Sequence, residues 1–186
     1  TWILDKFTTV LIILVIIIFQ PELRRFLEKL GTSNKLFSPL LNQSEGESLA
    51  IIKHITKAST MLSEINMGAL IVIEVTTNLS EYIASGIPIQ SQITGDLIAS
   101  LFWTGAPTHD GALIVRGNKV EAAGCLLPLS QAQLTDRRVG TRHLAAMGIS
   151  EISDALVIAI SEETGVISIV ENGTMNRYIT KEALES

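Results

Sequence analysis

Four runs of consecutive apolar residues place the strongest constraint on how this chain can fold. They cover residues 68–75, 112–116, 155–160 and 166–170. Short runs of this kind, rich in valine and isoleucine, are typical of strands that are buried on both faces. Gly117-Asn118 leads from the second run to residues 119–126, and residues 161–165 join the last two runs. We therefore expect two β-hairpins within one sheet.

The segments between these runs carry helical signals. Apolar residues recur at helical spacing over 48–65, and the segments 78–86, 94–103, 141–147 and 180–186 begin with residues that cap or open helices. The fold class we predict is α/β (α+β): a mixed, largely antiparallel, twisted β-sheet flanked by helices. Asn172-Gly173 is expected to end the sheet. Neither nucleotide-binding glycine motif is present, and no Cys/His pairs stand at zinc spacing.

The N-terminus differs in composition from the rest of the chain. Val10 to Phe19 is uninterrupted apolar sequence, preceded by further apolar residues and followed by Arg24, Arg25 and Lys29. Cations that follow an apolar span are typical of the cytoplasmic end of a transmembrane helix. We expect a truncated membrane anchor over 1–20, a juxtamembrane helix and linker over 21–45, and a cytoplasmic domain over 46–186. A buried core helix or strand is the alternative for residues 1–20.

Charge and cysteine content narrow the classes of partner and compartment. The chain has 14 Lys and Arg against 19 Asp and Glu, a formal charge of -5. This acidic balance, without a basic stripe, argues against nucleic-acid binding. The single cysteine, Cys125, lies in an apolar run and has no partner for an internal disulfide, which fits a reducing compartment.

Two polar motifs are candidates for chemistry. His109-Asp110-Gly111-Ala112 opens an apolar strand, so the Asp110 carboxylate should lie at a strand mouth, beside two small residues that leave room for a ligand. Gly140-Thr141-Arg142-His143 opens a helix. Backbone N–H groups there, with the hydroxyl and the two basic side chains, would form a phosphate site. Asp110 would then hold the divalent cation that accompanies such phosphates.

Each motif also has a purely structural explanation. Asp110 could be a turn residue, Thr141 an N-cap, Arg142 and His143 a solvated helix face, and Glu162-Glu163 an acidic turn. All these clusters fall at the ends of predicted strands or at the helix beside them. That shared location favours a site.

At these residues the chain resembles the diadenylate cyclase family, of the membrane-anchored kind, over most of residues 20–175. Of the family's two signature tripeptides, DGA is intact as Asp110-Gly111-Ala112. The second, RHR, is matched by Arg142 and His143 only, because Leu144 replaces the second arginine. Leu126 also replaces a tyrosine that is common near the adenine. Further matching segments are Phe19 to Arg25, Gly68 to Glu74, Ala123 to Cys125, Leu127 to Ser130 and Ser161 to Gly165.

The resemblance implies an enzyme that condenses two ATP molecules into cyclic di-AMP and releases two pyrophosphates at a face-to-face homodimer. It implies catalysis at Asp110, Gly111 and Ala112, with Mg²⁺ or Mn²⁺ held by Asp110 and His109. Thr141, Arg142 and His143 would hold the phosphates, Ser161 and Glu162 would border the triphosphate or its metal, and Leu127 would face the adenine. Loss of the second arginine would weaken phosphate binding by about 1.5–3 kcal/mol.

Two other functions stay open at this stage. Leu144 in the second signature is also consistent with a catalytically degenerate, membrane-anchored ATP-binding sensor. A membrane scaffold, whose sheet domain binds a regulatory protein at the membrane or in the cytosol, is the other alternative.

Overall fold

The computed structural model describes residues 2, 6, 11, 45–131 and 140–185. The chain divides into two compact units, Thr1–Leu41 and Asn42–Ser186, and the β-sheet belongs to the second. The membrane anchor predicted over 1–20 and the juxtamembrane helix and linker predicted over 21–45 lie almost wholly outside the described residues. Within the described part of the chain, no helix is long and apolar enough to cross a bilayer.

The second unit is built on one seven-stranded sheet in the order β2-β4-β3-β1-β5-β6-β7. Only the central β1–β3 pair is parallel, and the other five pairs are antiparallel. The sheet is therefore mixed and largely antiparallel, as the sequence predicted. The strands are β1 (Ala69–Glu74), β2 (Ile87–Gln92), β3 (Ala112–Arg116), β4 (Lys119–Cys125), β5 (Leu156–Ile160), β6 (Ile167–Glu171) and β7 (Thr174–Arg177).

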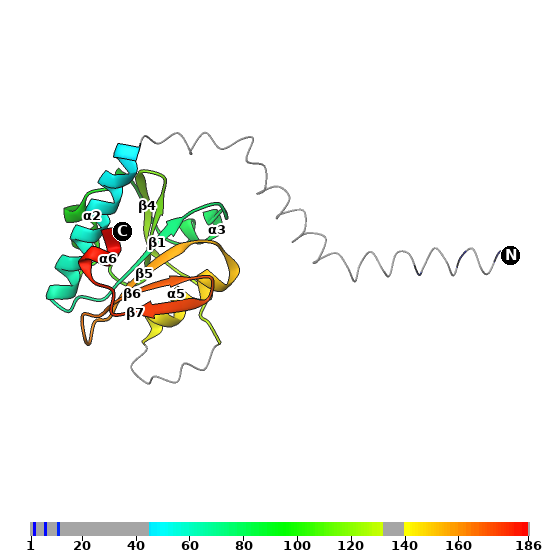
Figure 1. The fold of residues 1–186 in the computed structure, drawn as a ribbon. Coiled ribbons are helices and arrows are strands. Elements are labelled where there is room, and N and C mark those ends of the chain that lie inside the picture. Colours follow the sequence, from blue (N-terminus) through cyan, green and yellow to red (C-terminus); the bar gives the residue numbers. More distant parts are fainter. Residues whose placement is uncertain (1, 3–5, 7–10, 12–44, 132–139, 186) are drawn as a thin grey trace. The chain divides into compact units, whose positions relative to one another are not determined.

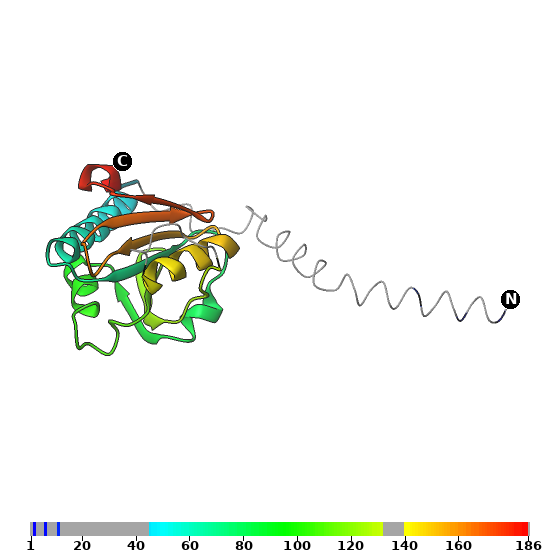
Figure 2. The ribbon, with the colours of Figure 1, turned by 90° about the horizontal axis from the view of Figure 1, so that it is seen from below.

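Helices cover both faces of the sheet, which explains the continuous apolar runs. Ala69 and Ile71 of β1 pack in the core beneath α2 (Glu45–Glu64) and α4 (Gly95–Leu101). Leu70 and Val72, with the opposite strand parity, pack in the core beneath α5 (Thr141–Ile152). Figures 1 and 2 show α2 and α5 on opposite sides of the strands. Two short helices, α3 (Ser80–Ile83) and α6 (Lys181–Glu185), complete the unit.

The two edge strands, β2 and β7, were not predicted. Residues alternate between exposed and half-buried along β7, and β2 is exposed over most of its length and contains Pro88. Edge strands tolerate proline and bury little apolar surface, so they lack the signal that marks the inner strands. The prediction that Asn172-Gly173 ends the sheet was wrong, because these residues form the turn between β6 and β7.

Polar contacts fix the far end of the β1–β3 pair. Arg116 Nε and Nη2 donate to the two carboxylate oxygens of Glu74 at 2.7 and 2.8 Å, and this hydrogen bonding raises the pKa of Arg116. The backbone N–H groups of Thr76 and Thr77 donate to Asp154 at 3.1 and 2.8 Å. Burial acts to raise the pKa of Asp154, but these bonds outweigh it and lower the pKa.

Candidate functional site

The loop that carries Asp110 is held by two glycines. Asp110 is exposed and stands two residues before β3. Gly111 has φ +117°, and a Cβ there would lie 2.6 Å from the carbonyl carbon of Gly124. Gly124 itself has φ +69°, and the backbone oxygen of Asp110 would lie 3.5 Å from its added Cβ. Only glycine allows this close approach of loop and strand, and the approach fixes the backbone on either side of Asp110.

The neighbouring His109 has one ring nitrogen occupied. Its Nδ1 lies 2.6 Å from the carbonyl oxygen of Ala106, and its backbone N–H donates to the same oxygen at 3.2 Å. A carbonyl oxygen only accepts, so Nδ1 donates to it, and in the neutral ring the lone pair is then on Nε2. Metal-binding histidines are commonly oriented by such a bond to a backbone carbonyl. Nε2 is therefore the nitrogen of His109 that could bind a cation.

The start of α5 supplies donors for an anion. Gly140 is the N-cap, and no side chain caps this end of the helix. Thr141 is the first helical residue, so the N-cap alternative for Thr141 was wrong. The first N–H groups of a helix lack the usual carbonyl partner one turn earlier, although here those of His143 and Leu144 donate to the carbonyl oxygen of Gly140. The helix dipole adds partial positive charge at this end. These groups are the ones a phosphate can use.

Arg142 joins the helix start to the Asp110 loop. Its Nη1 donates to Oε2 of Glu162, and its Nη2 donates to the backbone oxygen of His109 at 3.3 Å. The Arg142 side chain is 20 % exposed and that of Glu162 is 66 % exposed. The guanidinium is thus held from two sides, while the Glu162 carboxylate remains accessible to a ligand.

Gly68 makes room for this ion pair. A Cβ at position 68 would lie 2.7 Å from Arg142 Nη1 and 2.9 Å from Glu162 Cβ. Sequence reasoning treated Gly68 only as the start of an apolar run. A glycine immediately before a buried strand was the available signal, because a close approach of other groups is a common reason for glycine there.

Most of the predicted phosphate-binding residues share one small hollow. It is lined by Gly140, Thr141, Arg142, His143, Ile160, Ser161, Glu162 and Glu163. Asp110 and Leu127 do not line it. Asp110 adjoins it through the contact between Arg142 and His109, whereas half-buried Leu127 packs against the core under α5. Leu126 is 72 % exposed at the end of β4.

His143 and Ser161 are less accessible than the sequence suggested. His143 is only 3 % exposed, and burial, with smaller contributions from Arg177 and Arg142, lowers its pKa. Its Nε2 is buried and has no hydrogen-bond partner among the described residues. The lowered pKa favours the neutral imidazole, which can donate one hydrogen bond but carries no charge. Ser161 is 6 % exposed, and its Oγ accepts from the N–H of Thr164 at 3.3 Å.

Protein donors for a metal are few at this site. Among the described residues, no group of three or more His, Cys, Asp and Glu side chains could together hold an ion. Asp110 and His109 are adjacent in sequence and offer one carboxylate and one imidazole nitrogen. That set suits Mg²⁺ or Mn²⁺ bound together with nucleotide, since Mg²⁺ takes most of its ligands from phosphates and water.

Comparisons with known proteins give a consistent assignment. Residues 56–175 match the DAC family model, described as "DisA bacterial checkpoint controller nucleotide-binding". Cyclic di-AMP synthase CdaA of Bacillus subtilis is 42% identical over 184 residues, which is 99% of this chain and 67% of that protein. A diadenylate cyclase of Listeria monocytogenes is 40% identical over 183 residues, 98% of this chain and 67% of its own length.

Solved structures agree with the sequence relatives. A double mutant of DacA from Staphylococcus aureus superposes with a TM-score of 0.73 at 42% identity, covering 76% of this chain and 94% of that one. A hypothetical membrane spanning protein from Bacillus cereus superposes at 0.66 with 34% identity, covering 89% and 80%. The family model, the relatives and the shared fold together lead to one conclusion: the chain belongs to the diadenylate cyclase (DAC) family and is an enzyme of the nucleotidyltransferase class.

Proposed function

We propose that the chain condenses two molecules of ATP into cyclic di-AMP and two pyrophosphates. The observation that carries the proposal is the contact of Arg142 Nη2 with the backbone oxygen of His109. This contact sets the start of α5 beside the loop of Asp110. The residues at the start of α5 can therefore bind a triphosphate while the Asp110 loop faces its reacting end.

In the proposed reaction, the 3′-oxygen of each ATP attacks the α-phosphorus of the other, and pyrophosphate leaves. Asp110 accepts the proton of the 3′-hydroxyl, since its carboxylate is exposed at the strand mouth. Gly111 and Ala112 have no bulky side chains and leave room for the substrate beside Asp110. Thr141, Arg142 and the free N–H groups of α5 bind the phosphates, and buried His143 adds one neutral hydrogen bond. Positioning and charge neutralisation supply most of the rate.

A divalent cation, Mg²⁺ or Mn²⁺, belongs to the proposal. Asp110 and Nε2 of His109 would hold it, and Glu162 is exposed enough to turn toward it when nucleotide displaces Glu162 from Arg142. When bound, the cation neutralises phosphate charge and lowers the pKa of the attacking hydroxyl. Ser161 would border the triphosphate, and Leu127 with exposed Leu126 would provide an apolar edge for the adenine.

Dimerisation follows from the symmetry of the product. Cyclic di-AMP has a two-fold axis, so two sites must meet face to face in an isologous homodimer. Exposure of Asp110, Thr141 and Glu162 leaves the site accessible to a second copy. We further propose that residues 1–20 anchor the chain in the cell membrane, residues 21–45 connect the anchor, and residues 46–186 form the catalytic domain in the cytoplasm. The Bacillus cereus neighbour, named as membrane spanning, supports that location.

The direct test is incubation of the chain with ATP and Mn²⁺, followed by mass spectrometry. We expect cyclic di-AMP and pyrophosphate in a 1:2 ratio, with loss of product in Asp110→Asn. Glu171→Asn, a change at an exposed carboxylate at the end of β6, serves as the control and should retain activity. No cyclic di-AMP from well-folded protein that binds ATP would refute the proposal.

A nucleotide sensor is the alternative that one observation favours. Leu144 occupies the place of the second signature arginine, so one cationic phosphate contact is missing. A sensor would bind ATP without releasing pyrophosphate, and Leu144→Arg would restore turnover. Turnover in the unmodified chain would exclude it.

A further inference from the structure

Residues 126–130, which we call the crossing segment, run from the end of β4 onto one face of α5. The backbone N–H of Leu126 donates to Ser85 Oγ at 3.0 Å, and Ser85 Oγ in turn donates to the carbonyl oxygen of Tyr82 at 2.6 Å. Leu127 then packs against the apolar cluster beneath α5. The first part of the crossing segment is therefore held in place by the residues that follow α3 and by the core.

The other end of the crossing segment is bonded to α5. The N–H of Ser130 donates to the carbonyl oxygen of Leu144 at 3.0 Å, and Ser130 Oγ donates to Glu151 Oε1 at 2.5 Å. A hydroxyl–carboxylate bond of this length is charge-assisted and stronger than a neutral one. Leu144 and Glu151 lie about two helical turns apart, so both bonds reach the same face of α5. Ser130 is only 8 % exposed, so water has little access to this contact.

Gly148 lets the backbones of the helix and the crossing segment touch. It lies in the middle of α5, where glycine is unfavourable compared with almost any other residue. A Cβ there would lie 2.1 Å from the carbonyl oxygen of Pro128 and 2.8 Å from the backbone nitrogen of Ser130. Both are backbone atoms, so a side chain at position 148 would push the whole segment off the helix. This close approach accounts for the glycine.

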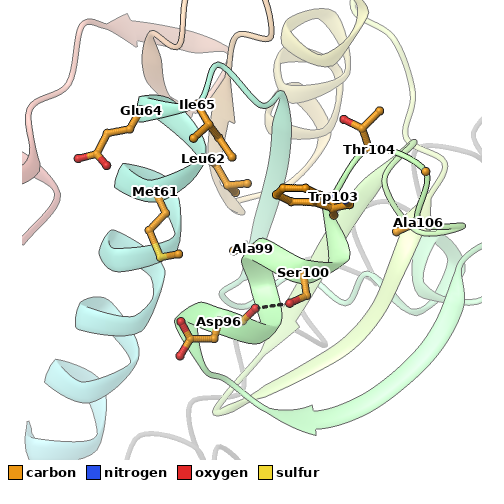
Figure 3. A pocket seen from close by; sticks show the side chains of 11 residues that line it. Met61, Leu62, Glu64, Ile65, Asp96, Ala99, Ser100, Trp103, Thr104 and Ala106 are labelled. Atoms are coloured by element: carbon orange, nitrogen blue, oxygen red, sulfur yellow. Dashed lines mark hydrogen bonds between the residues drawn. The ribbon is translucent and has the colours of Figure 1, made fainter.

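The crossing segment joins two parts of the proposed nucleotide site. Leu127, the residue proposed to face the adenine, belongs to the segment, whereas Thr141 and Arg142, proposed to bind the phosphates, belong to the start of α5. Both parts lie on the α5 side of the sheet. The hollow of about 910 Å³ between α2 and α4 lies on the opposite side and shares no residue with the segment (Figure 3). The spacing between base and phosphates is therefore set by how the segment rests on α5.

We propose that Ser130, Glu151 and Gly148 are positioning residues for the nucleotide. Their contacts, which we call the clamp, fix the distance between the residue that faces the base and the residues that hold the phosphates. None of the three lines the hollow that contains the phosphate-binding residues, so they act through the crossing segment. The inference rests on the proposed binding of ATP at this site.

Loss of the clamp should weaken ligands that use both parts of the site and spare those that use the phosphate part alone. Arg142 is held by Glu162 and by the backbone oxygen of His109, and neither contact involves the crossing segment. Inorganic triphosphate should therefore bind as before. ATP must order the loosened segment when it binds, and ordering a side chain such as Leu127 weakens binding by about three- to tenfold. A merely structural weakening would lower both affinities together.

The test is calorimetric titration of the full chain, in the presence of Mn²⁺, with α,β-methylene-ATP or with inorganic triphosphate. In Ser130→Ala we expect the ATP analogue to bind about three- to tenfold more weakly and triphosphate to bind equally well. Glu151→Ala should behave alike, and the double variant should lose no more, because each change removes the same bond. Ser153→Ala removes a hydroxyl that donates to the carbonyl oxygen of Ile149, near the far end of α5, and is the matched control that should change neither affinity.

Gly148→Ala should weaken the ATP analogue more than Ser130→Ala does, because it displaces the backbone of the segment. Thermal melts show which variants fold, and Ser130→Ala with Glu151→Ala decides the matter if Gly148→Ala does not. Equal losses for both ligands in the folded variants, or no loss for either, would overturn the inference.

The outcome can be told apart from that of the cyclase function. If the clamp variants lose affinity for the ATP analogue alone in a chain that makes no cyclic di-AMP, the positioning role stands and the cyclase function fails. If the chain makes cyclic di-AMP and the two affinities keep their ratio in every folded variant, the cyclase function stands and the positioning role fails. No binding of the analogue to the unmodified chain would overturn both.

Discussion

Replacing Gly68 by alanine tests whether packing holds the ion pair at the nucleotide site. The added Cβ would lie 2.7 Å from Arg142 Nη1 and 2.9 Å from Glu162 Cβ, closer than non-bonded carbon and nitrogen atoms allow. The guanidinium is the far end of a flexible side chain and can move. However, moving it breaks the bonds to Glu162 and to the backbone oxygen of His109. The Glu162 Cβ moves only with its backbone.

The expected cost has two parts. Overpacking of this kind destabilises a protein by about 1–3 kcal/mol. A displaced guanidinium would also lose the charge-assisted bond to phosphate proposed for Arg142, worth about 1.5–3 kcal/mol, so catalytic efficiency should fall by about tenfold or more. In an Arg142→Ala background the closest clash disappears. Gly68→Ala should then cost less stability and almost no further activity.

The double-mutant cycle compares the unmodified chain, Gly68→Ala, Arg142→Ala and the double variant. Urea unfolding measures the stability of each protein, and a pyrophosphate-release assay measures its activity. We expect a coupling energy of about 1 kcal/mol or more between positions 68 and 142. Additive effects, or full activity in Gly68→Ala, would show that Arg142 is not held as described.

Four further predictions follow from the geometry. Gly111→Ala should lower stability by about 2–4 kcal/mol, measured by urea unfolding, because position 111 has φ +117° and its Cβ would meet the backbone of residue 124. Glu162→Gln should change stability by less than about 1 kcal/mol, since the Glu162 carboxylate is 66 % exposed, yet raise KM for ATP in the release assay. In the folded protein the pKa of Asp154 is lowered from its usual value of 3.8. The stability that the Asp154 carboxylate contributes is therefore present above pH 3.8 and is lost as the pH falls through the folded-state pKa. Asp154→Asn should flatten the acid limb of the plot of stability against pH. Burial raises the pKa of the Cys125 thiol to about 11, so iodoacetamide at neutral pH should label it only after unfolding.

The inner strands could be predicted because a strand that is buried on both faces is a run of consecutive apolar residues. β1, β3, β5 and β6 correspond to apolar runs. β2 and β7 lie at the two edges of the sheet, where few side chains are buried, and their polar sequences carry no comparable signal. Pro88 even argues against a strand unless the strand is known to be an edge.

Only some residues of the candidate site could be predicted from the sequence. Asp110, Thr141 and Arg142 could be proposed because turn and helix-start signals coincided with polar residues. The burial of His143, which lowers its pKa, could not be predicted, because it depends on how deeply the first turn of α5 packs on the sheet. The role of Gly68 depends on contacts with residues more than seventy positions away, which no local pattern records. The orientation of His109 by Ala106 likewise needs coordinates.

The central claim is that the Asp110 loop and the start of α5 bind one metal-bound triphosphate between them. A crystal structure with a non-reactive ATP analogue and Mn²⁺, with anomalous scattering at the manganese edge, tests it most directly. We expect the manganese peak within coordination distance of the Asp110 carboxylate and of Nε2 of His109, and phosphate oxygens on Arg142 and on the first N–H groups of α5. Manganese and phosphates bound elsewhere, with these groups still facing solvent, would contradict the account.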